Sequence, residues 1–340
     1  MPELLDNQIA KDIKDIVFSA RENIARQLNN EMLMAYWQIG KRICRFEESQ
    51  KYDEKSARTL IIELSAYLTK EIGKGFSRSN LFNMRRFYKL YPSVQSLTGQ
   101  LSWTHYCELI AISDEHERSF YEKECIHSKW SVRELKRQIS TSLFERLLLS
   151  KGEANKETVL SLAKNGNEYM KPMDVLKDPY VFEFLNLPEE KPVLEKDLER
   201  ALLLQLEHFL LELGRGFMFV GSQQRITLGN KHYYVDLVFY NKILRAYVLI
   251  DLKINDLVPE HFGQMNMYVN YYNAEVNDEG DNPPIGILLC KGKDEIVAEY
   301  AIGGLSTNIF ASTYVKYIPE KEQLIKQMEY VLRKNRGGDE

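Results

Sequence analysis

The sequence predicts an all-helical N-terminal half followed by an α/β domain with a mixed central sheet. Through residues 8–150, apolar residues recur at helical spacing and no segment has a clear strand pattern. Glycine, proline and asparagine then concentrate over residues 150–178. After Pro192, short β-rich segments follow a long amphipathic helix. We therefore expect a helical domain over residues 1–150, a linker over 151–170 and an α/β domain over 171–335.

The composition is typical of a globular protein. Of 340 residues, 44% are hydrophobic and 28% are charged, which excludes a disordered or fibrous chain. The four cysteines form no CxxC pair, so neither a zinc site nor a disulfide framework is expected. No apolar run approaches the roughly 20 residues that a membrane helix needs, and the N-terminus lacks a secretory pattern. We expect a cytoplasmic protein without membrane contact.

The helices of the N-terminal half can be placed in order. Helical periodicity begins near residue 8, and we expect Gly40 to interrupt it before a further helix around residues 57–68. Ser77 or Ser79 caps a helix that Pro92 ends. The remaining helices are predicted over Trp103–Ile112, Glu115–His127 and, from a capping box formed by Ser131 and Glu134, through Leu148.

One of these helices carries a basic and aromatic pattern. No acidic residue occurs between Glu71 and Glu108, and the glycines at 73 and 75 fit the turn of a helix-turn-helix. The cations that would meet DNA phosphates are Arg78, Arg85, Arg86 and Lys89. Alternatively, the apolar residues of this helix are core and its arginines are an ordinary solvated face.

The α/β domain has its own succession of elements. An apolar stripe predicts one helix over Leu194–Leu213, capped by Gly214. Four short strands follow, over Phe217–Gly221, Gln223–Leu228, His232–Tyr240 and Arg245–Ile254. A helix then begins at Pro259 and ends near Tyr272. The last elements are a strand over Ile285–Cys290, a helix near Asp294–Tyr300 and a strand over Tyr314–Ile318.

Two of the strands bring ionisable residues together. Asp236 interrupts an apolar strand, and burying a carboxylate there is costly unless it is paired or binds a cation. Asp251 and Lys253 share one face of the next strand. A tight turn at Asn241-Lys242 makes the strands antiparallel neighbours, which can place Asp236 beside Asp251. Two carboxylates suit Mg²⁺, and a lysine beside them can orient or deprotonate water. A buried salt bridge is the simpler alternative.

The following helix adds two more polar residues. Gln264 and Tyr268 are four residues apart and therefore share one helical face, on which Glu260 also lies.

These segments resemble the PD-(D/E)XK nuclease superfamily, and specifically the bacterial YhcG-type family. The resemblance rests on Tyr233–Tyr240, Ile250–Ile254 and Gly263–Tyr268, and on further strings in both halves, such as Tyr36–Gly40 and Asn282–Cys290. It covers nearly all of residues 10–320. It implies a restriction-endonuclease-like domain after a helical N-terminal domain. It also implies Asp236 and Asp251 as metal ligands, Lys253 as the catalytic lysine, and Gln264 and Tyr268 as a supporting pair.

The superfamily often adds an acid from the preceding helix. Glu199 matches the family string best, whereas Glu207 lies nearer the following strand. This chain has Asp251 where many relatives have glutamate, which could shift the metal, and Val235 stands where the superfamily name has proline.

The resemblance implies a metal-dependent DNA endonuclease that hydrolyses phosphodiester bonds with Mg²⁺ or Mn²⁺. Its N-terminal domain would position duplex or branched DNA, and a homodimer would allow paired cuts. The alternative is a catalytically weak nucleic-acid-binding or assembly module that retains the nuclease fold.

Overall fold

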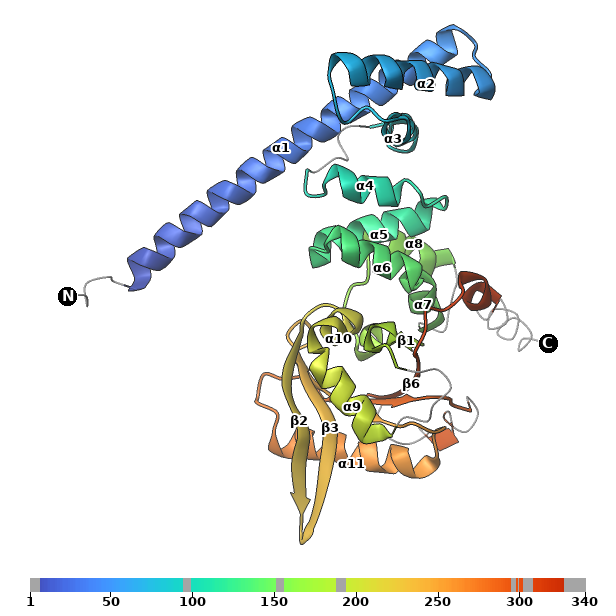
Figure 1. Ribbon diagram of the computed structural model, residues 1–340. Helices are drawn as coiled ribbons and strands as arrows, with labels where there is room; N and C mark the ends of the chain where they lie inside the picture. The colour runs from blue at the N-terminus through green and yellow to red at the C-terminus, as the bar shows by residue number, and fades with distance from the viewer. Residues whose placement is uncertain are drawn as a thin grey trace. The chain divides into compact units, whose positions relative to one another are not determined.

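Helices make up the first part of the chain, and the second part contains both helices and strands. The computed structural model describes residues 7–93, 99–150, 156–187, 194–294, 298, 300–301 and 308–326. The chain forms two compact units, Met1–Lys136 and Arg137–Glu340. The first is helical and the second contains a six-stranded mixed sheet, which confirms the predicted fold class (Figure 1). The linker predicted over residues 151–170 stays a prediction.

The N-terminal unit is built from helices with recognisable caps. The side chain of Asp53 accepts a hydrogen bond from the Ser56 amide, and Ser77 does the same for Asn80. Such caps satisfy amides that a helix leaves unpaired at its start. The helices are α1 (Asn7–Ser49), α2 (Glu54–Glu71), α3 (Arg78–Leu90), α4 (Trp103–Leu109), α5 (Glu115–Ser128) and the first part of α6 (Val132–Ser140).

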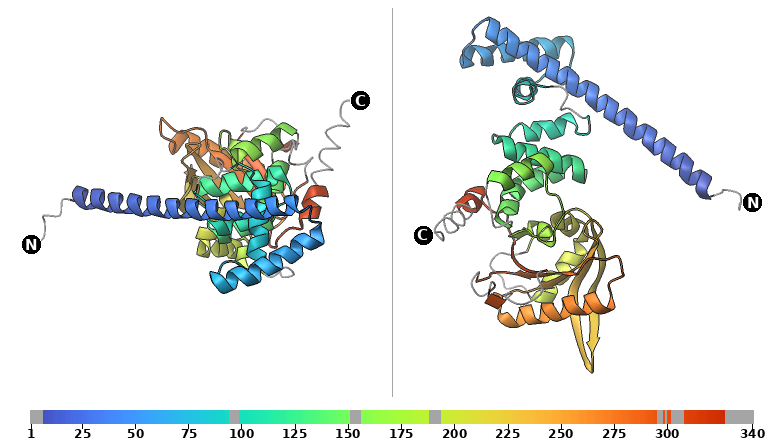
Figure 2. Two further views of the ribbon diagram at one scale, coloured as in Figure 1. Left: turned by 90° about the horizontal axis from the view of Figure 1, so that it is seen from above. Right: turned by 180° about the vertical axis from the view of Figure 1, so that it is seen from behind.

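The predicted interruption at Gly40 is wrong. Helix α1 (Asn7–Ser49) includes Gly40, and both views of Figure 2 draw this helix without a break. A Cβ atom at Gly40 would lie 2.0 Å from the carbonyl oxygen of Met84 and 3.1 Å from the Cβ of Tyr88. Gly40 therefore permits the close approach of α1 and α3, and its role is in packing rather than in helix termination.

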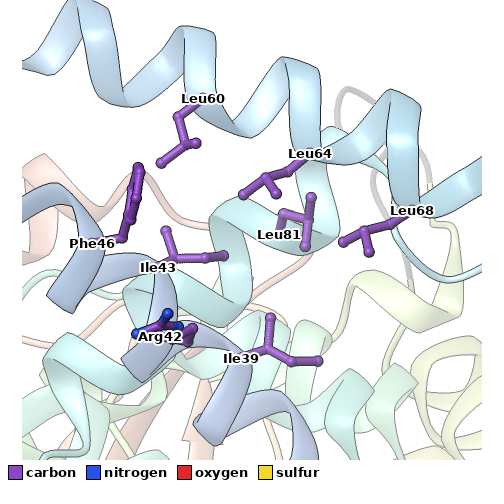
Figure 3. A pocket seen from close by; sticks show the side chains of 8 residues that line it. All are labelled: Ile39, Arg42, Ile43, Phe46, Leu60, Leu64, Leu68 and Leu81. Carbon is purple, nitrogen blue, oxygen red and sulfur yellow. The ribbon is translucent and has the colours of Figure 1, made fainter.

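An apolar pocket of about 300 Å³ lies among the first three helices (Figure 3). Figure 3 shows Ile39, Ile43 and Phe46 of α1 across from three leucines of α2. Leu81 of α3 also lines the pocket, and Arg42 is the one charged residue in the lining. This lining offers no combination of acids, bases or nucleophiles for catalysis.

The helix predicted from Ser131 through Leu148 is wrong as a single element. Ser131 does cap α6 by accepting from the Glu134 amide at 3.2 Å. Helix α6 ends at Ser140, however, because Ser142 adopts a left-handed φ of 52° before α7 (Leu143–Ser150) begins.

The sheet of the C-terminal unit has the strand order β1-β6-β5-β4-β3-β2. Strands β2, β3 and β4 are antiparallel neighbours, whereas β4, β5, β6 and β1 run parallel. This arrangement confirms the predicted mixed sheet. The strands are β1 (Tyr180–Val181), β2 (Phe217–Leu228), β3 (Lys231–Asn241), β4 (Ala246–Leu252), β5 (Ile285–Cys290) and β6 (Ile309–Val315).

Helices cover both faces of this sheet. On one face, α9 (Glu195–Leu204) and α10 (Leu206–Leu213) bury Leu198, Leu202 and Phe209. On the other face, α11 (Pro259–Glu275) buries Phe262 and Met265 (Figures 1 and 2). Each helix covers the apolar side chains of one sheet face, as a layered α/β fold requires.

The helix predicted over residues 194–213 is also two helices. Gln205 separates α9 from α10 with non-helical angles, φ −114° and ψ 32°. Gly214 ends α10 as predicted, with φ 109°.

The two strands predicted over residues 217–228 are the single strand β2. A register shift between Phe219 and Gly221 marks a bulge, and Gln223 has a left-handed φ of 48°. These irregularities fall where the sequence predicts a gap between strands.

The remaining elements lie at the margins of the unit. Helix α8 (Lys156–Asn165) lies inside the predicted linker, and short 3-10 turns occupy Pro172–Val175 and Glu183–Leu185. The strand predicted over residues 314–318 is found earlier, as β6. The helix predicted near residues 294–300 falls mostly outside the described residues. Among the helices that the structure describes, none combines the length and the apolar composition needed to cross a bilayer.

Candidate active site

Two carboxylates meet where β3 and β4 separate. The last paired residues of these strands are Leu237 and Ile250. Continuing the same antiparallel register, Asp236 and Asp251 are the next two residues to face each other. Asp251 is only 2% exposed. The structure therefore brings together the two acids that the sequence predicts, at the point where the strands diverge.

Lys253 completes the predicted trio. Its Nζ lies 2.8 Å from Oδ2 of Asp251, and its backbone amide donates to the carbonyl of Leu289 at 2.7 Å. The backbone bond continues the ladder toward β5 and fixes the lysine beside its aspartate. The alternation of side chains along the strand correctly predicted this shared face.

Burial and charge perturb both members of this pair. Burial raises the pKa of Asp251, and the neighbouring charge of Asp236 raises it further, to about 7, although Lys253 opposes the shift. Burial alone would lower the pKa of Lys253, but Asp251, Glu195 and Asp236 outweigh it and raise that pKa. The lysine is therefore a cation at neutral pH.

Asp236 is held by donors on both sides. Its Oδ2 accepts from the Leu252 backbone amide at 2.8 Å, and its Oδ1 accepts from Nε2 of Gln223 at 3.0 Å. The bond to Leu252 spans the gap where β3 and β4 no longer pair.

Gln223 joins a third carboxylate to the site. The same Nε2 donates to Oε2 of Glu199 at 2.9 Å, so one amide bridges Glu199 on α9 and Asp236 on β3. Burial raises the pKa of Glu199 despite this hydrogen bond, and the charge of Asp236 adds to the shift. Glu207 lies on α10 and is exposed, so Glu199 is the acid that the structure links to Asp236.

Sequence reasoning missed Gln223. The only available signal was the break at Ser222 between two predicted strand segments, directly before Gln223. A left-handed residue inside a strand is uncommon and marks a local constraint. Here the constraint coincides with a side chain that contacts two carboxylates.

Gln264 and Tyr268 lie behind the acids on α11. Tyr268 is fully buried and its hydroxyl donates to the Tyr234 carbonyl at 3.0 Å, while the Gln264 amide donates to that hydroxyl. Burial raises the pKa of Tyr268, and Asp251 and Asp236 contribute to the shift. This pair therefore ties α11 to β3 next to the acids.

The residues present fit a divalent cation. Oδ2 of Asp251 is buried and pairs with the Lys253 ammonium, and Asp236 adds a second carboxylate beside it. Carboxylate oxygens are the ligands that Mg²⁺ and Mn²⁺ favour. Among the described residues, no three His, Cys, Asp or Glu side chains form a ready-made cluster. A cation here would be held mainly by Asp236 and Asp251, with water or substrate oxygens supplying other positions.

The cations predicted to bind DNA lie on α3 in the N-terminal unit. Arg78, Arg86 and Lys89 are exposed. Arg85 instead forms an ion pair with Glu47 of α1, at 2.8 Å between Nε and Oε2, and is only partly exposed. Leu81, Met84 and Phe87 are buried in the helical core. The helix therefore has both a core face and a cationic face, and Arg85 belongs to the contact between α1 and α3.

Comparison with known proteins identifies two families of domain along the chain. Residues 173–329 match the YhcG PDDEXK nuclease domain, and residues 12–146 match the DUF1016 N-terminal domain. The Escherichia coli (strain K12) protein named "Putative nuclease YhcG" is 35% identical over 353 residues, which cover 94% of this chain and 93% of that protein. These matches confirm the resemblance found in the sequence.

Two solved structures are also similar to part of the chain. One is described as a repair endonuclease from Pyrococcus abyssi, with a TM-score of 0.25 over 39% of this chain and 50% of that one. The other is described as an EndoMS–dsDNA2 complex, with a TM-score of 0.26 over 40% of this chain and 50% of that one. Each shares 17% sequence identity with this chain.

Proposed function

This chain belongs to the YhcG family of nuclease-domain proteins, and we propose that it is a metal-dependent DNA endonuclease. The reaction is hydrolysis of a phosphodiester bond at the site formed by Asp236, Asp251 and Lys253. The observation that supports it most is the convergence of these groups: the buried Asp251 lies next to Asp236, and its Oδ2 is 2.8 Å from Nζ of Lys253. A purely structural salt bridge would not require a second carboxylate beside the first.

The two aspartates and the lysine have different proposed roles in the reaction. Mg²⁺ or Mn²⁺ bound by Asp236 and Asp251 would polarise a phosphoryl oxygen and make a bound water more acidic. The Lys253 ammonium remains charged beside Asp251. It is therefore suited to donate to a phosphate oxygen, or to orient a water, as negative charge develops on the phosphate.

The surrounding residues act by positioning. Tyr268 fixes α11 against β3 through the Tyr234 carbonyl, and Gln264 in turn holds the Tyr268 hydroxyl. Gln223 keeps Asp236 in place and links it to Glu199. Glu199 is a candidate water-mediated ligand, because it reaches the site through an amide rather than directly.

DNA is the proposed substrate, with the N-terminal helical unit as a positioning element. The exposed cations Arg78, Arg86 and Lys89 on α3 supply charge for phosphates. Arg85 is the exception among the predicted DNA contacts, because its guanidinium is engaged with Glu47.

Plasmid nicking tests the proposal. The wild-type protein should nick supercoiled DNA with Mg²⁺ or Mn²⁺ and not with EDTA. Lys253→Ala should lose activity by a factor of about 100 or more, since an electrostatic donor at the reacting phosphate is removed. Lys242→Ala, an exposed lysine in the turn after β3, is the matched control.

Equal nicking by the wild-type protein and Lys253→Ala, or nicking unaffected by EDTA, would overturn the catalytic assignment. DNA binding without cleavage by the wild-type protein would instead support the module that keeps the nuclease fold but has lost cleavage.

A further inference from the structure

The β2–β3 hairpin extends beyond the sheet from the position of the site. Strand β3 pairs with β4 only over Leu237–Asn241, whereas its pairing with β2 continues to Lys231. The part of the hairpin from Gln224 to Val235 is here called the arm. Its two strands pair with each other, and no third strand pairs with them among the described residues. Figure 1 shows the arm crossing the level of α11 and projecting beyond that helix. Asp236 lies at its base.

One face of the arm is covered. Ile226 and Val235 are almost completely buried in the core under α11, and Tyr233 packs against the same core. The hydrogen bond from Tyr268 to the carbonyl of Tyr234 adds a polar attachment. The arm is thus held in a defined direction relative to the acids.

The opposite face of the arm is exposed to solvent and is here called the bare face. Because side chains alternate along a strand, the neighbours of Ile226 and Val235 point away from this core. Arg225 pairs with Tyr234, and Thr227 pairs with His232. All four are exposed, and Tyr234 leaves 47% of its surface open to solvent.

The bare face presents side chains of the kinds that bind nucleic acids. It offers a guanidinium, an aromatic ring, and a hydroxyl and imidazole 3.0 Å apart. Lys231 adds a second cation near the tip of the arm, on the same face as Tyr233. The arm contains no acidic residue, although residues 151–340 have a net charge of −7. A cationic strip in an otherwise acidic unit is typical of a surface for phosphates.

We propose that the bare face of the arm binds duplex DNA next to the phosphate that is cut, an inference that depends on the proposed nuclease function. A two-stranded ribbon fits the major groove of a duplex. From Gln223 to Thr227 the strand advances about 13 Å at 3.3 Å per residue. A DNA strand carries one phosphate per about 3.4 Å of axis, so these residues reach about four nucleotides from the site. Arg225 contacts a phosphate, and Tyr234 lies against the sugar or base edges.

Binding measured without cleavage tests the arm. Fluorescence anisotropy of a short labelled DNA duplex is followed in EDTA over a series of salt concentrations. Arg225→Ala should weaken binding and reduce the slope of log K against log salt by about 0.9, the value for one phosphate contact. Tyr234→Ala should weaken binding with little change in slope, and Tyr234→Phe should restore it.

Lys242→Ala is the matched control, because this lysine is exposed at the other end of β3. A wild-type slope and affinity in Arg225→Ala and Tyr234→Ala would overturn the inference. So would equal effects of Arg225→Ala and Lys242→Ala, since they would show a general charge effect.

The nicking and binding experiments distinguish a failure of this inference from a failure of the proposed function. If wild-type protein nicks DNA and Lys253→Ala does not, while the arm variants bind normally, only the arm is wrong. If wild-type protein never cleaves but Arg225→Ala lowers the salt slope, the arm binds DNA and the catalytic proposal is wrong.

Discussion

Asp251 is a residue whose position disfavours its own ionisation in the folded protein. Its carboxylate is buried, lies beside a second carboxylate and pairs with the Lys253 ammonium. In the absence of a cation, ionising this group in the folded protein is unfavourable.

The first prediction concerns Asp251→Asn without divalent ions. The folded pKa of Asp251 is raised from 3.8 to about 7. Below the unfolded pKa of 3.8 the carboxyl is protonated in both states and does not reduce the free energy of unfolding. As pH rises from there toward the folded pKa, the unfolded state ionises more readily than the folded state, and the free energy of unfolding falls. The free energy of unfolding of Asp251→Asn relative to wild type should increase between pH 4 and pH 7, by at most about 1.4 kcal/mol per pH unit. The Tm of the variant relative to wild type should increase over the same range. Calorimetry in EDTA measures it, and a pH-independent difference would contradict the prediction.

Gln223 gives a second prediction. Replacement by glycine removes the amide that joins Glu199 to Asp236 and suits the left-handed φ of 48°. Residues that orient metal ligands typically contribute about 10- to 100-fold. Gln223→Gly should slow nicking by that factor and raise the Mn²⁺ concentration needed for half-maximal rate.

Gln224→Ala is the control for that variant, because its side chain bonds to the Ser222 carbonyl rather than to an acid. If both variants nicked at the wild-type rate with an unchanged Mn²⁺ requirement, Gln223 would have no positioning role.

At this scale the sequence predicted the residues whose positions follow from strand periodicity. Asp251 and Lys253 share a face because they are two residues apart, and Asp236 is their neighbour because a short turn joins the strands. Gln223 could not be predicted, since its position depends on a left-handed backbone angle. The ion pair of Arg85 could not be predicted either, because Glu47 is 38 residues away on another helix.

At the scale of elements, propensity located the helices but tertiary contacts decided where they end. Gly40 lies within α1 because the helix needs a residue without a side chain against Met84. Gln205 and Ser142, by contrast, interrupt segments whose apolar periodicity predicts continuous helices. Periodicity reports which face is buried, and it does not report a local change of backbone direction.

Gly40→Ala tests the packing role of that glycine. The added methyl group would meet the Met84 carbonyl, so α1 and α3 must move apart, and overpacking of this kind costs about 1–3 kcal/mol. Urea unfolding should show the loss. Gly263→Ala in α11 is the control, since nothing lies within 4 Å of its Cβ position, and it should be neutral or stabilising by up to about 1 kcal/mol. Equal stability of Gly40→Ala and wild type would contradict the packing role.

At the scale of the whole molecule, a buried charge network joins distant parts of the C-terminal unit. Glu212 is completely buried, and its carboxylate contacts Arg146 of α7 and Arg137 of α6, while Lys177 donates to its backbone carbonyl. Burial alone would raise the pKa of Glu212, but Arg146, Lys177 and Arg137 lower it to about 2. Removing part of such a network leaves an uncompensated buried charge, which costs about 3–5 kcal/mol.

A truncation tests the importance of this network. A fragment of residues 131–340 keeps both arginines and the Ser131 cap of α6, and it should fold with a cooperative thermal transition. A fragment of residues 152–340 begins in the predicted linker and lacks Arg137 and Arg146. It should be insoluble or melt at a clearly lower temperature in circular dichroism. Equal melting of the two fragments would show that the network is dispensable.

The general architecture was predictable because composition changes along the chain, whereas this network was not. Arg137 and Arg146 read as ordinary charged residues of a helical domain, and only the tertiary structure shows them against a carboxylate 66 or more residues later.

The continuity of α1 through Gly40 has a geometrical consequence. Several apolar residues of its N-terminal half, such as Ile9, Ile16, Ile24 and Leu28, are more than half exposed. At 1.5 Å per residue, Ile9 stands about 46 Å along the axis from Gly40. Inserting one residue between Met32 and Gly40 would rotate that stripe by about 100° relative to the end packed on α3. Because α1 is continuous, the direction of the exposed apolar residues is fixed relative to the end of the helix that packs on α3.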